Sequence, residues 1–178
     1  MPMKRRPKSA GKLVVLENND LISAEMEQIQ SRIRERAYEL SQLRRHSGRE
    51  VDDWLSAESE IISVPPVEMI EKEGAYHVQL VVAGINLDDV NVMATNEQML
   101  IKCDFRHDHA GSGIVHLCDF KSATVFRSVH FPQRIDRGSL KVEFQDGILR
   151  ITAVKEGAVR AAPERPPAKK AVAKRAGA

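Results

Sequence analysis

The spacing of apolar residues changes once along this chain, at Pro65-Pro66, and this change limits the fold more than any other feature of the sequence. Before the two prolines, apolar residues recur every three or four positions over 21–46, which is the period of an amphipathic helix. After them, apolar residues such as Val78, Leu80 and Val82 alternate with their neighbours, which is typical of β-strands. The sequence therefore predicts a helical unit followed by a β unit.

The helical unit is predicted to be a hairpin of two helices over residues 21–62. The apolar face of the first helix consists of Ile22, Met26, Ile29, Ile33, Ala37, Leu40 and Leu43. Gly48 is placed to end this helix, and a shorter one follows with Val51, Trp54 and Leu55 on one side. A unit of about forty residues buries little core by itself. The spacing leaves open whether its apolar face binds other proteins, forms a dimer or packs on the β unit.

The β unit is predicted to be an all-β immunoglobulin-like sandwich. About seven short segments with strand periodicity follow Pro66, separated by turn signals at regular spacing. The strongest of these signals is Asp146-Gly147 between two alternating runs, which is typical of a tight β-hairpin. Aromatic residues make up only 4% of the chain, so the core of the sandwich is expected to be mostly aliphatic.

The small net charge of +2 hides basic ends and an acidic centre. Residues 1–12 contain five bases and no acid, and residues 156–178 contain six bases and two acids. Because both ends have few residues that could be buried, we expect disorder over 1–20 and 158–178. No apolar run approaches the roughly 18 residues that span a bilayer, and two cysteines cannot form a disulfide framework. The sequence therefore predicts a cytoplasmic protein that does not bind a membrane.

Two motifs of the β unit carry a resemblance to a known family. Residues 142–149, VEFQDGIL, are similar to the A-x-x-x-n-G-v-L signature of the small heat-shock proteins, with Val142 in place of the alanine. Residues 126–132, FRSVHFP, are similar to the F-R-x-f-x-L-P strand of the same proteins. Residues 64–157 as a whole resemble the α-crystallin domain of that family. The corresponding signature residues are Arg127, Pro132, Gly147, Ile148 and Leu149. Within the hairpin, residues 33–60 resemble a short bacterial helical family of unknown function.

The resemblance implies an ATP-independent chaperone, or holdase, that binds unfolding client proteins and forms a homodimer or a larger homo-oligomer. It implies a client groove between two strands, lined by Val78, Leu80, Val82, Leu140, Val142 and Phe144. The alternative is that these six side chains are core. It also implies a strand exchanged between the subunits of a dimer, formed by Ile114, Val115, His116, Leu117 and Cys118. The alternative there is a long surface loop.

The C-terminal residues lack the I-x-I/V motif that fills the groove in the family. We therefore expect residues 14–16 or 62–64, which also present apolar side chains two residues apart, to take its place. The simpler interpretation of Ile62 and Val64 is that they begin a strand.

Three other classes of function have weaker support in the sequence. There is no catalytic motif, and the cysteines and histidines over 103–118 fit no standard zinc spacing, so we expect no enzyme activity, cofactor or metal. Residues 166–175 resemble a histone tail in composition, which leaves nucleic-acid binding open. A co-chaperone-like module that binds one folded partner on the same sandwich also stays open.

Overall fold

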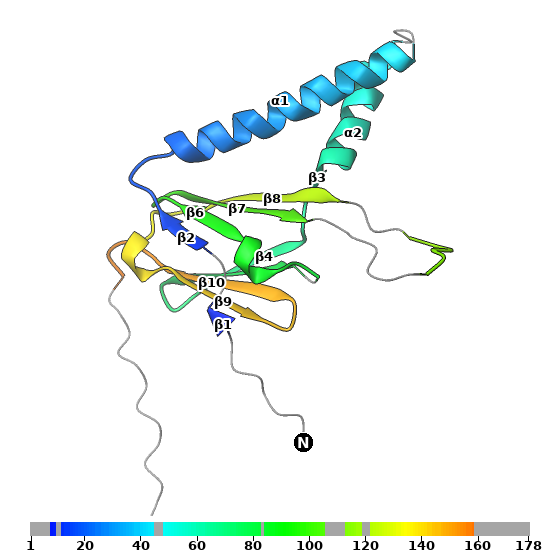
Figure 1. Cartoon of the computed structure of the whole chain (residues 1–178). Coiled ribbons are helices and arrows are strands. Elements are labelled where there is room, and N and C mark those ends of the chain that lie inside the picture. The colour runs from blue at the N-terminus through cyan, green and yellow to red at the C-terminus, as the bar shows by residue number, and fades with distance from the viewer. Residues whose placement is uncertain are drawn as a thin grey trace, which may run out of the picture.

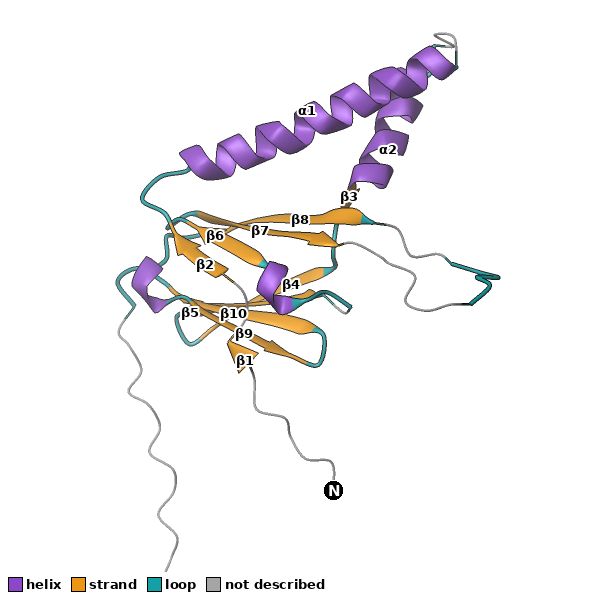
Figure 2. Cartoon of the chain, in the orientation of Figure 1, coloured by secondary structure: helices purple, strands orange, loops and turns teal. Residues whose placement is uncertain are grey.

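The computed structural model consists of a β-sandwich with a helical hairpin on one of its sheets (Figure 1 and Figure 2). It describes residues 8–9, 12–44, 48–82, 84–105, 113–118 and 122–158. The predicted fold class, an all-β sandwich preceded by a helical hairpin, is confirmed. The tail that we expect to be disordered, 158–178, lies outside the described residues except for Ala158. No helix in the described part of the chain is long and apolar enough to cross a membrane.

The first sheet has five strands in the order β1-β9-β10-β5-β4. The strands are β1 (Lys8–Ser9), β4 (Val67–Lys72), β5 (Ala75–Val81), β9 (Lys141–Gln145) and β10 (Ile148–Val154). All neighbours in this sheet are antiparallel. Strand β5 is therefore interior, whereas β4 forms one edge.

The second sheet has five strands in the order β2-β6-β7-β8-β3. The strands are β2 (Lys12–Val15), β3 (Ile62–Ser63), β6 (Asn91–Ala94), β7 (Gln98–Phe105) and β8 (Ala123–His130). Strands β6, β7 and β8 are antiparallel, while β2 and β3 add parallel to the outer edges of β6 and β8. Two short 3₁₀ helices, η1 (Leu87–Asp89) and η2 (Arg137–Ser139), lie in connections between strands.

The main core fills the space between the two sheets and is largely aliphatic, as the composition predicts. Leu80, Met99, Ile101 and Leu149 are fully buried there. The alternation of side chains explains this arrangement, because every second side chain of a strand points at the opposite sheet.

The turn between β9 and β10 is the tight hairpin that the sequence predicts. Asp146 and Gly147 are its two residues, with φ of 53° and 79°. Positive φ at both positions is what a type I′ turn requires, and it matches the right-handed twist of the flanking strands. Glycine at 147 therefore has a structural reason in this hairpin.

The N-terminal residues differ from the expected disorder over 1–20. Residues 12–15 form β2, and Leu16 is buried. These residues are stabilised by pairing with the edge of β6, a contact that lies about eighty positions further along the chain. Composition alone does not reveal such a partner.

The hairpin consists of α1 (Asp20–Leu43) and α2 (Glu50–Ile61), close to the predicted bounds. The two helices pack through Ile29, Ile33 and Ala57, all buried. The N-terminal half of α1 lies on the outer face of the second sheet, above β6, β7 and β8 (Figure 1). Of the three roles left open for the apolar face of α1, the structure therefore supports packing on the β unit.

Candidate functional site

Three of the six residues predicted to line a client groove are core residues instead. Val78, Leu80 and Val82 are 1%, 0% and 2% exposed and belong to the main core. Strand β5 pairs on one side with β4 and on the other with β10, so it has no free edge to offer a peptide. The prediction of a groove at this strand is wrong, because the sequence does not show which strands are interior to a sheet.

The other three predicted groove residues lie near an edge of the first sheet. Leu140, just before β9, is buried, whereas Val142 and Phe144 are half-buried and pack against the main core. On the second sheet, the antiparallel strands end at β6 on the same side of the sandwich. We call the line between these two strands the β6–β9 seam.

Residues 8–9 and 12–16 of the same chain cover this seam, and we call them the N-terminal strap. Strand β1 pairs with β9, and β2 pairs with β6 (Figure 1). Leu13 of the strap packs against the main core from the side. The seam is therefore closed in cis by the strap.

The strap only partly matches the segments expected to replace the missing docking motif. Val14 and Leu16 pack beneath α1, away from the seam, and the residue that reaches the main core is Leu13. Ile62 begins β3, as in the simpler interpretation. The sequence analysis missed Leu13; the signal that could have found it is the β-favouring run Leu13–Leu16.

The segment predicted to be exchanged between subunits is exposed in the single chain. Ile114, Val115 and Leu117 are 84%, 53% and 82% exposed, and neither these residues nor His116 and Cys118 lie in a strand. In Figure 1 this segment projects beyond the end of β7 and β8. Among the described residues, the outer edge of β4 has no partner strand. One chain thus carries both an unpaired edge and an exposed apolar segment, while the exchange itself stays a prediction.

The signature residues lie in two places, at strand β8 and at the β-hairpin formed by β9 and β10. Leu149 is fully buried and Ile148 half-buried in β10, and Pro132 is exposed after β8. Arg127 is half-buried in β8, and its Nε is buried without a hydrogen-bond partner among the described residues.

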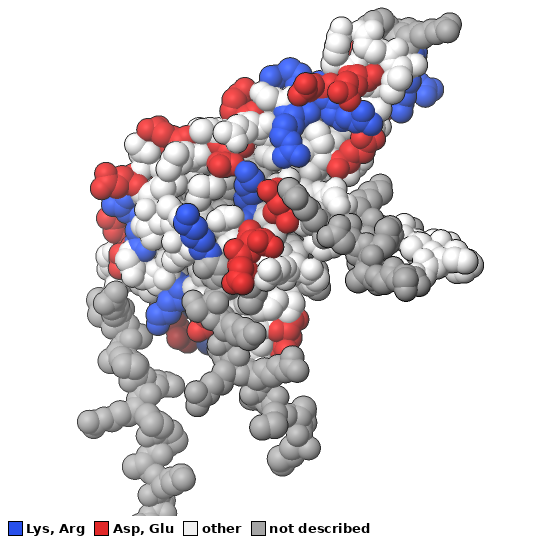
Figure 3. Space-filling view, viewed as in Figure 1, with Lys and Arg blue, Asp and Glu red and all other residues white. Residues whose placement is uncertain are grey.

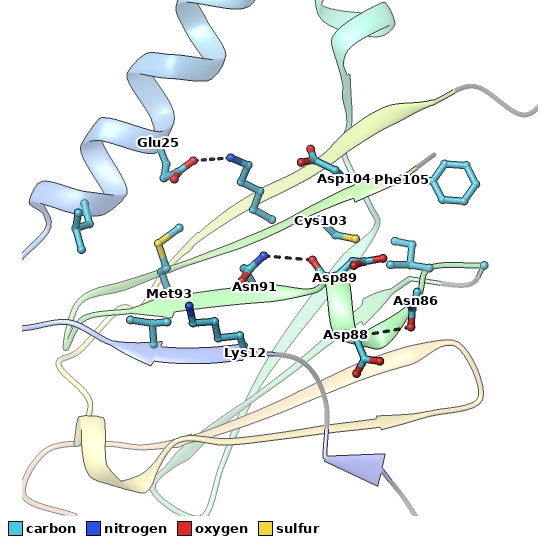
Figure 4. A pocket seen from close by; sticks show the side chains of 15 residues that line it. Lys12, Glu25, Asn86, Asp88, Asp89, Asn91, Met93, Cys103, Asp104 and Phe105 are labelled. Carbon is cyan, nitrogen blue, oxygen red and sulfur yellow. Dashed lines mark hydrogen bonds and ion pairs between the residues drawn. The ribbon is translucent and has the colours of Figure 1, made fainter. Parts of the chain in front are cut away.

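A pocket of about 870 Å³ lies between the strap, α1 and β7 (Figure 4). Its lining carries charges of both signs, including Lys12, Asp89 and Asp104. Nζ of Lys102 donates a hydrogen bond to Oε2 of Glu25 at 2.6 Å, which joins β7 to α1. In the described ranges, no group of three His, Cys, Asp or Glu side chains could hold a metal. That the protein needs no metal stays a prediction.

Cys103 also lines this pocket but is only 2% exposed. Burial, followed by the nearby carboxylates of Asp89 and Asp104, raises the pKa of its thiol to about 11. The thiol is therefore protonated at neutral pH, and because the thiolate is the nucleophile, Cys103 is expected to be unreactive.

The sandwich, its signature hairpin and its edge strands point to one family, and a family model decides the matter. The model described as "Hsp20/alpha crystallin family" matches residues 68–168, more than half of the chain. The chain belongs to the Hsp20/alpha crystallin family. A second model, "Protein of unknown function (DUF2934)", matches residues 28–62, which contain most of the helical hairpin. No curated protein sequence matches this Hsp20 chain significantly.

The chain is similar to solved structures of small heat-shock proteins. Heat shock protein 16.0 from Schizosaccharomyces pombe is 18% identical, with a TM-score of 0.50, and the match covers 64% of this chain and 99% of that one. HSP18.5 from E. histolytica is also 18% identical, with a TM-score of 0.49 over 56% of this chain and 95% of that one. At 18% identity, the match to heat shock protein 16.0 supports the Hsp20 fold alone.

Proposed function

We propose that this Hsp20 protein is an ATP-independent chaperone that binds unfolding proteins and prevents their aggregation. The observation that carries the proposal is the β6–β9 seam, where two sheet edges and half-buried apolar side chains lie beneath a short strap. An edge of this kind binds extended chains through backbone hydrogen bonds and apolar pockets. Unfolding proteins expose such chains, and no nucleotide is needed for this binding.

The proposal includes a homodimer as the smallest assembly and larger oligomers built from it. Its support is the combination of an exposed apolar segment, Ile114–Cys118, with the unpaired edge of β4. Pairing of the segment with β4 of a second copy would satisfy the backbone groups along the outer edge of β4 and cover Met69 and Ile70, which are exposed. We also propose a cytoplasmic location, in keeping with the low cysteine content.

The two alternative functions have less support. The face in Figure 3 has Lys and Arg interspersed with Asp and Glu, not a continuous basic patch of the kind that follows a phosphate backbone. This face therefore offers no basic patch for nucleic acid, and the basic ends lie mostly outside the described residues. A module that binds one folded partner would show no protection of unrelated clients.

The proposed function is tested by light scattering of a heat-labile client at its unfolding temperature, without nucleotide. We expect this protein to suppress the scattering at near-stoichiometric ratios, because each chain offers its own seam. Unchanged aggregation of several unrelated clients would reject the holdase and favour the partner-binding module. A steeply salt-dependent shift of a DNA probe in place of client protection would favour nucleic-acid binding.

Replacing Leu13 by Ser is expected to loosen the strap and raise the binding of an apolar dye such as bis-ANS. Loss of this half-buried side chain costs about 1 kcal/mol, which increases the open population about fivefold. Val15→Ser is the matched control, because Val15 lies in the same strand but is 47% exposed. Equal dye binding by the two variants would show that the strap does not close the seam through Leu13.

A further inference from the structure

The outer face of the second sheet is apolar at a place where a sandwich usually meets water. Val14, Met93 and Leu100 are direct neighbours across β2, β6 and β7. Leu100 lies outside the main core, between Met99 and Ile101, which face the first sheet, and yet it is 0% exposed. Since the side chains of a strand alternate between faces, Leu100 points to the outside of the sandwich and needs a cover.

Helix α1 supplies that cover through one face. Ile22 is buried in one cluster with Leu100 and Leu16, and Met26 packs against the same cluster. One turn further, Ile29 and Ile33 meet Phe126 of β8, which touches both clusters. The spacing of four, three and four residues is that of an amphipathic helix lying along an apolar surface. The apolar face of α1 thus occupies the outer face of the second sheet.

Two polar contacts hold α1 in this position. The hydrogen bond between Lys102 and Glu25, described above, crosses from β7 to α1, and both side chains are partly buried, at 23% and 28% exposure. Further along, Nη1 of Arg32 donates to Oγ1 of Thr124 at 3.4 Å. Oγ1 of Thr124 in turn donates to Oδ1 of Asp104 at 2.8 Å. The contact between helix and sheet is therefore apolar at its centre and polar at its rim.

The cover is also incomplete, because a groove of about 290 Å³ remains between α1, α2 and β8. Trp54, Val64 and Phe126 are among its lining residues, and Val64 is 51% exposed. In Figure 1, α1 continues past the sheet and only α2 returns to it. The hairpin is attached at both ends to the sheet, through β2 at one edge and β3 at the other. It can rise from the face without leaving the molecule.

We infer that the helical hairpin is a lid over a second client surface, the outer face formed by Val14, Met93, Leu100 and Phe126. This inference rests on the proposed chaperone function and names a site and a mode of regulation for it. The ligand is an aliphatic amphipathic segment of an unfolding protein, since that is the chemistry of the α1 face that occupies the surface. Client and α1 compete for the same side chains, so opening of the hairpin sets the capacity of the chaperone.

Locking the lid tests this directly. Glu25→Cys and Lys102→Cys are combined with Cys118→Ser and joined by a short bis-maleimide, at the place where the two native side chains meet. Buried Cys103 stays unmodified, because its thiol is inaccessible and protonated. We expect the cross-linked protein to capture at least fivefold less client than the same variant capped with a monofunctional maleimide. Equal capture by the two samples would overturn the lid while leaving the chaperone function standing.

Unlocking the lid is the complementary test. Lys102→Glu places two carboxylates opposite each other, and the pair Glu25→Lys with Lys102→Glu restores an attractive contact. These changes are made in a Leu100→Cys, Cys118→Ser background, in which the rate of thiol labelling at position 100 is measured. We expect Lys102→Glu to raise this rate about tenfold, and the pair Glu25→Lys with Lys102→Glu to restore the rate of the background. Client capture should follow the same order. Arg134→Glu, an equal charge change at an exposed position after β8 and outside both proposed client surfaces, is the control.

Cys103 is the internal reference for this labelling, because it lies on the same strand but faces the main core. Labelling at position 100 without labelling at Cys103 indicates lid opening in a folded domain, as we expect. Labelling of both at one rate indicates general unfolding and overturns the lid. Faster labelling at position 100 with unchanged client capture also overturns it. Absence of capture by every variant, wild type included, rejects the chaperone function itself.

Discussion

Replacing both Ile114 and Leu117 by Asp is expected to dissociate the proposed dimer into monomers. The two side chains are 84% and 82% exposed in the single chain and would be buried against the partner in an exchanged dimer. Losing two such side chains costs about 3 to 5 kcal/mol of association energy, so the dissociation constant should rise by at least about a hundredfold. Sedimentation velocity over a range of protein concentrations measures this change.

The matched control is the pair Leu43→Asp and Val51→Asp. These residues are 76% and 71% exposed at the distal end of the hairpin and have no proposed part in the dimer. The control should keep the wild-type sedimentation coefficient. Dissociation of the control, but not of the variant with Asp at 114 and 117, would place the dimer interface at the helical hairpin. An unchanged sedimentation coefficient for the variant with Asp at 114 and 117 would reject the exchanged strand.

The largest loss of stability is expected for Leu149→Ala. Leu149 is 0% exposed at the centre of the first sheet, opposite Leu80 on β5 and Phe144 on β9. Shortening a fully buried leucine to alanine removes apolar contacts and leaves a cavity, which costs about 2 to 5 kcal/mol. Urea unfolding followed by circular dichroism measures this change at a fixed protein concentration, because assembly would otherwise contribute to it.

Val81→Ala is the control for that experiment. Val81 is at the end of β5, opposite Ile148, and is 51% exposed. We expect its replacement to cost about 0.5 kcal/mol or less, the usual range for surface positions. If the two variants lost the same stability, Leu149 would not be the centre of the core that its burial indicates.

The sequence predicted the local features of this fold because they depend on nearby residues. The change of period at Pro65-Pro66 separated helices from strands, since period reflects which side chains share a face. Asp146-Gly147 predicted its hairpin because few residue pairs adopt positive φ at two successive positions. The order of several motifs then indicated the Hsp20 family before any contact was known.

The order of the strands within the two sheets could not be predicted from the sequence. Leu80 and Phe144 show the same alternation, yet Leu80 is in β5, between β4 and β10, whereas Phe144 is in β9, which pairs on its outer side only with the two-residue strand β1. Alternation reports that a strand has a buried face, but the hydrogen-bond partners on either side come from distant parts of the chain. The proposed groove therefore included a strand that has no free edge.

The sequence by itself determined the family, the two helices, most strands of the sandwich and an apolar face on α1. Only the tertiary structure decided that this face covers Leu100 and that the N-terminal strap closes the seam between β6 and β9. The physical reason is that the hydrophobic effect favours burial of an apolar face but does not select the surface that buries it. Which surface meets that need depends on sheet topology, and pairing of Leu13 with Val92, far along the chain, is a consequence of the whole fold.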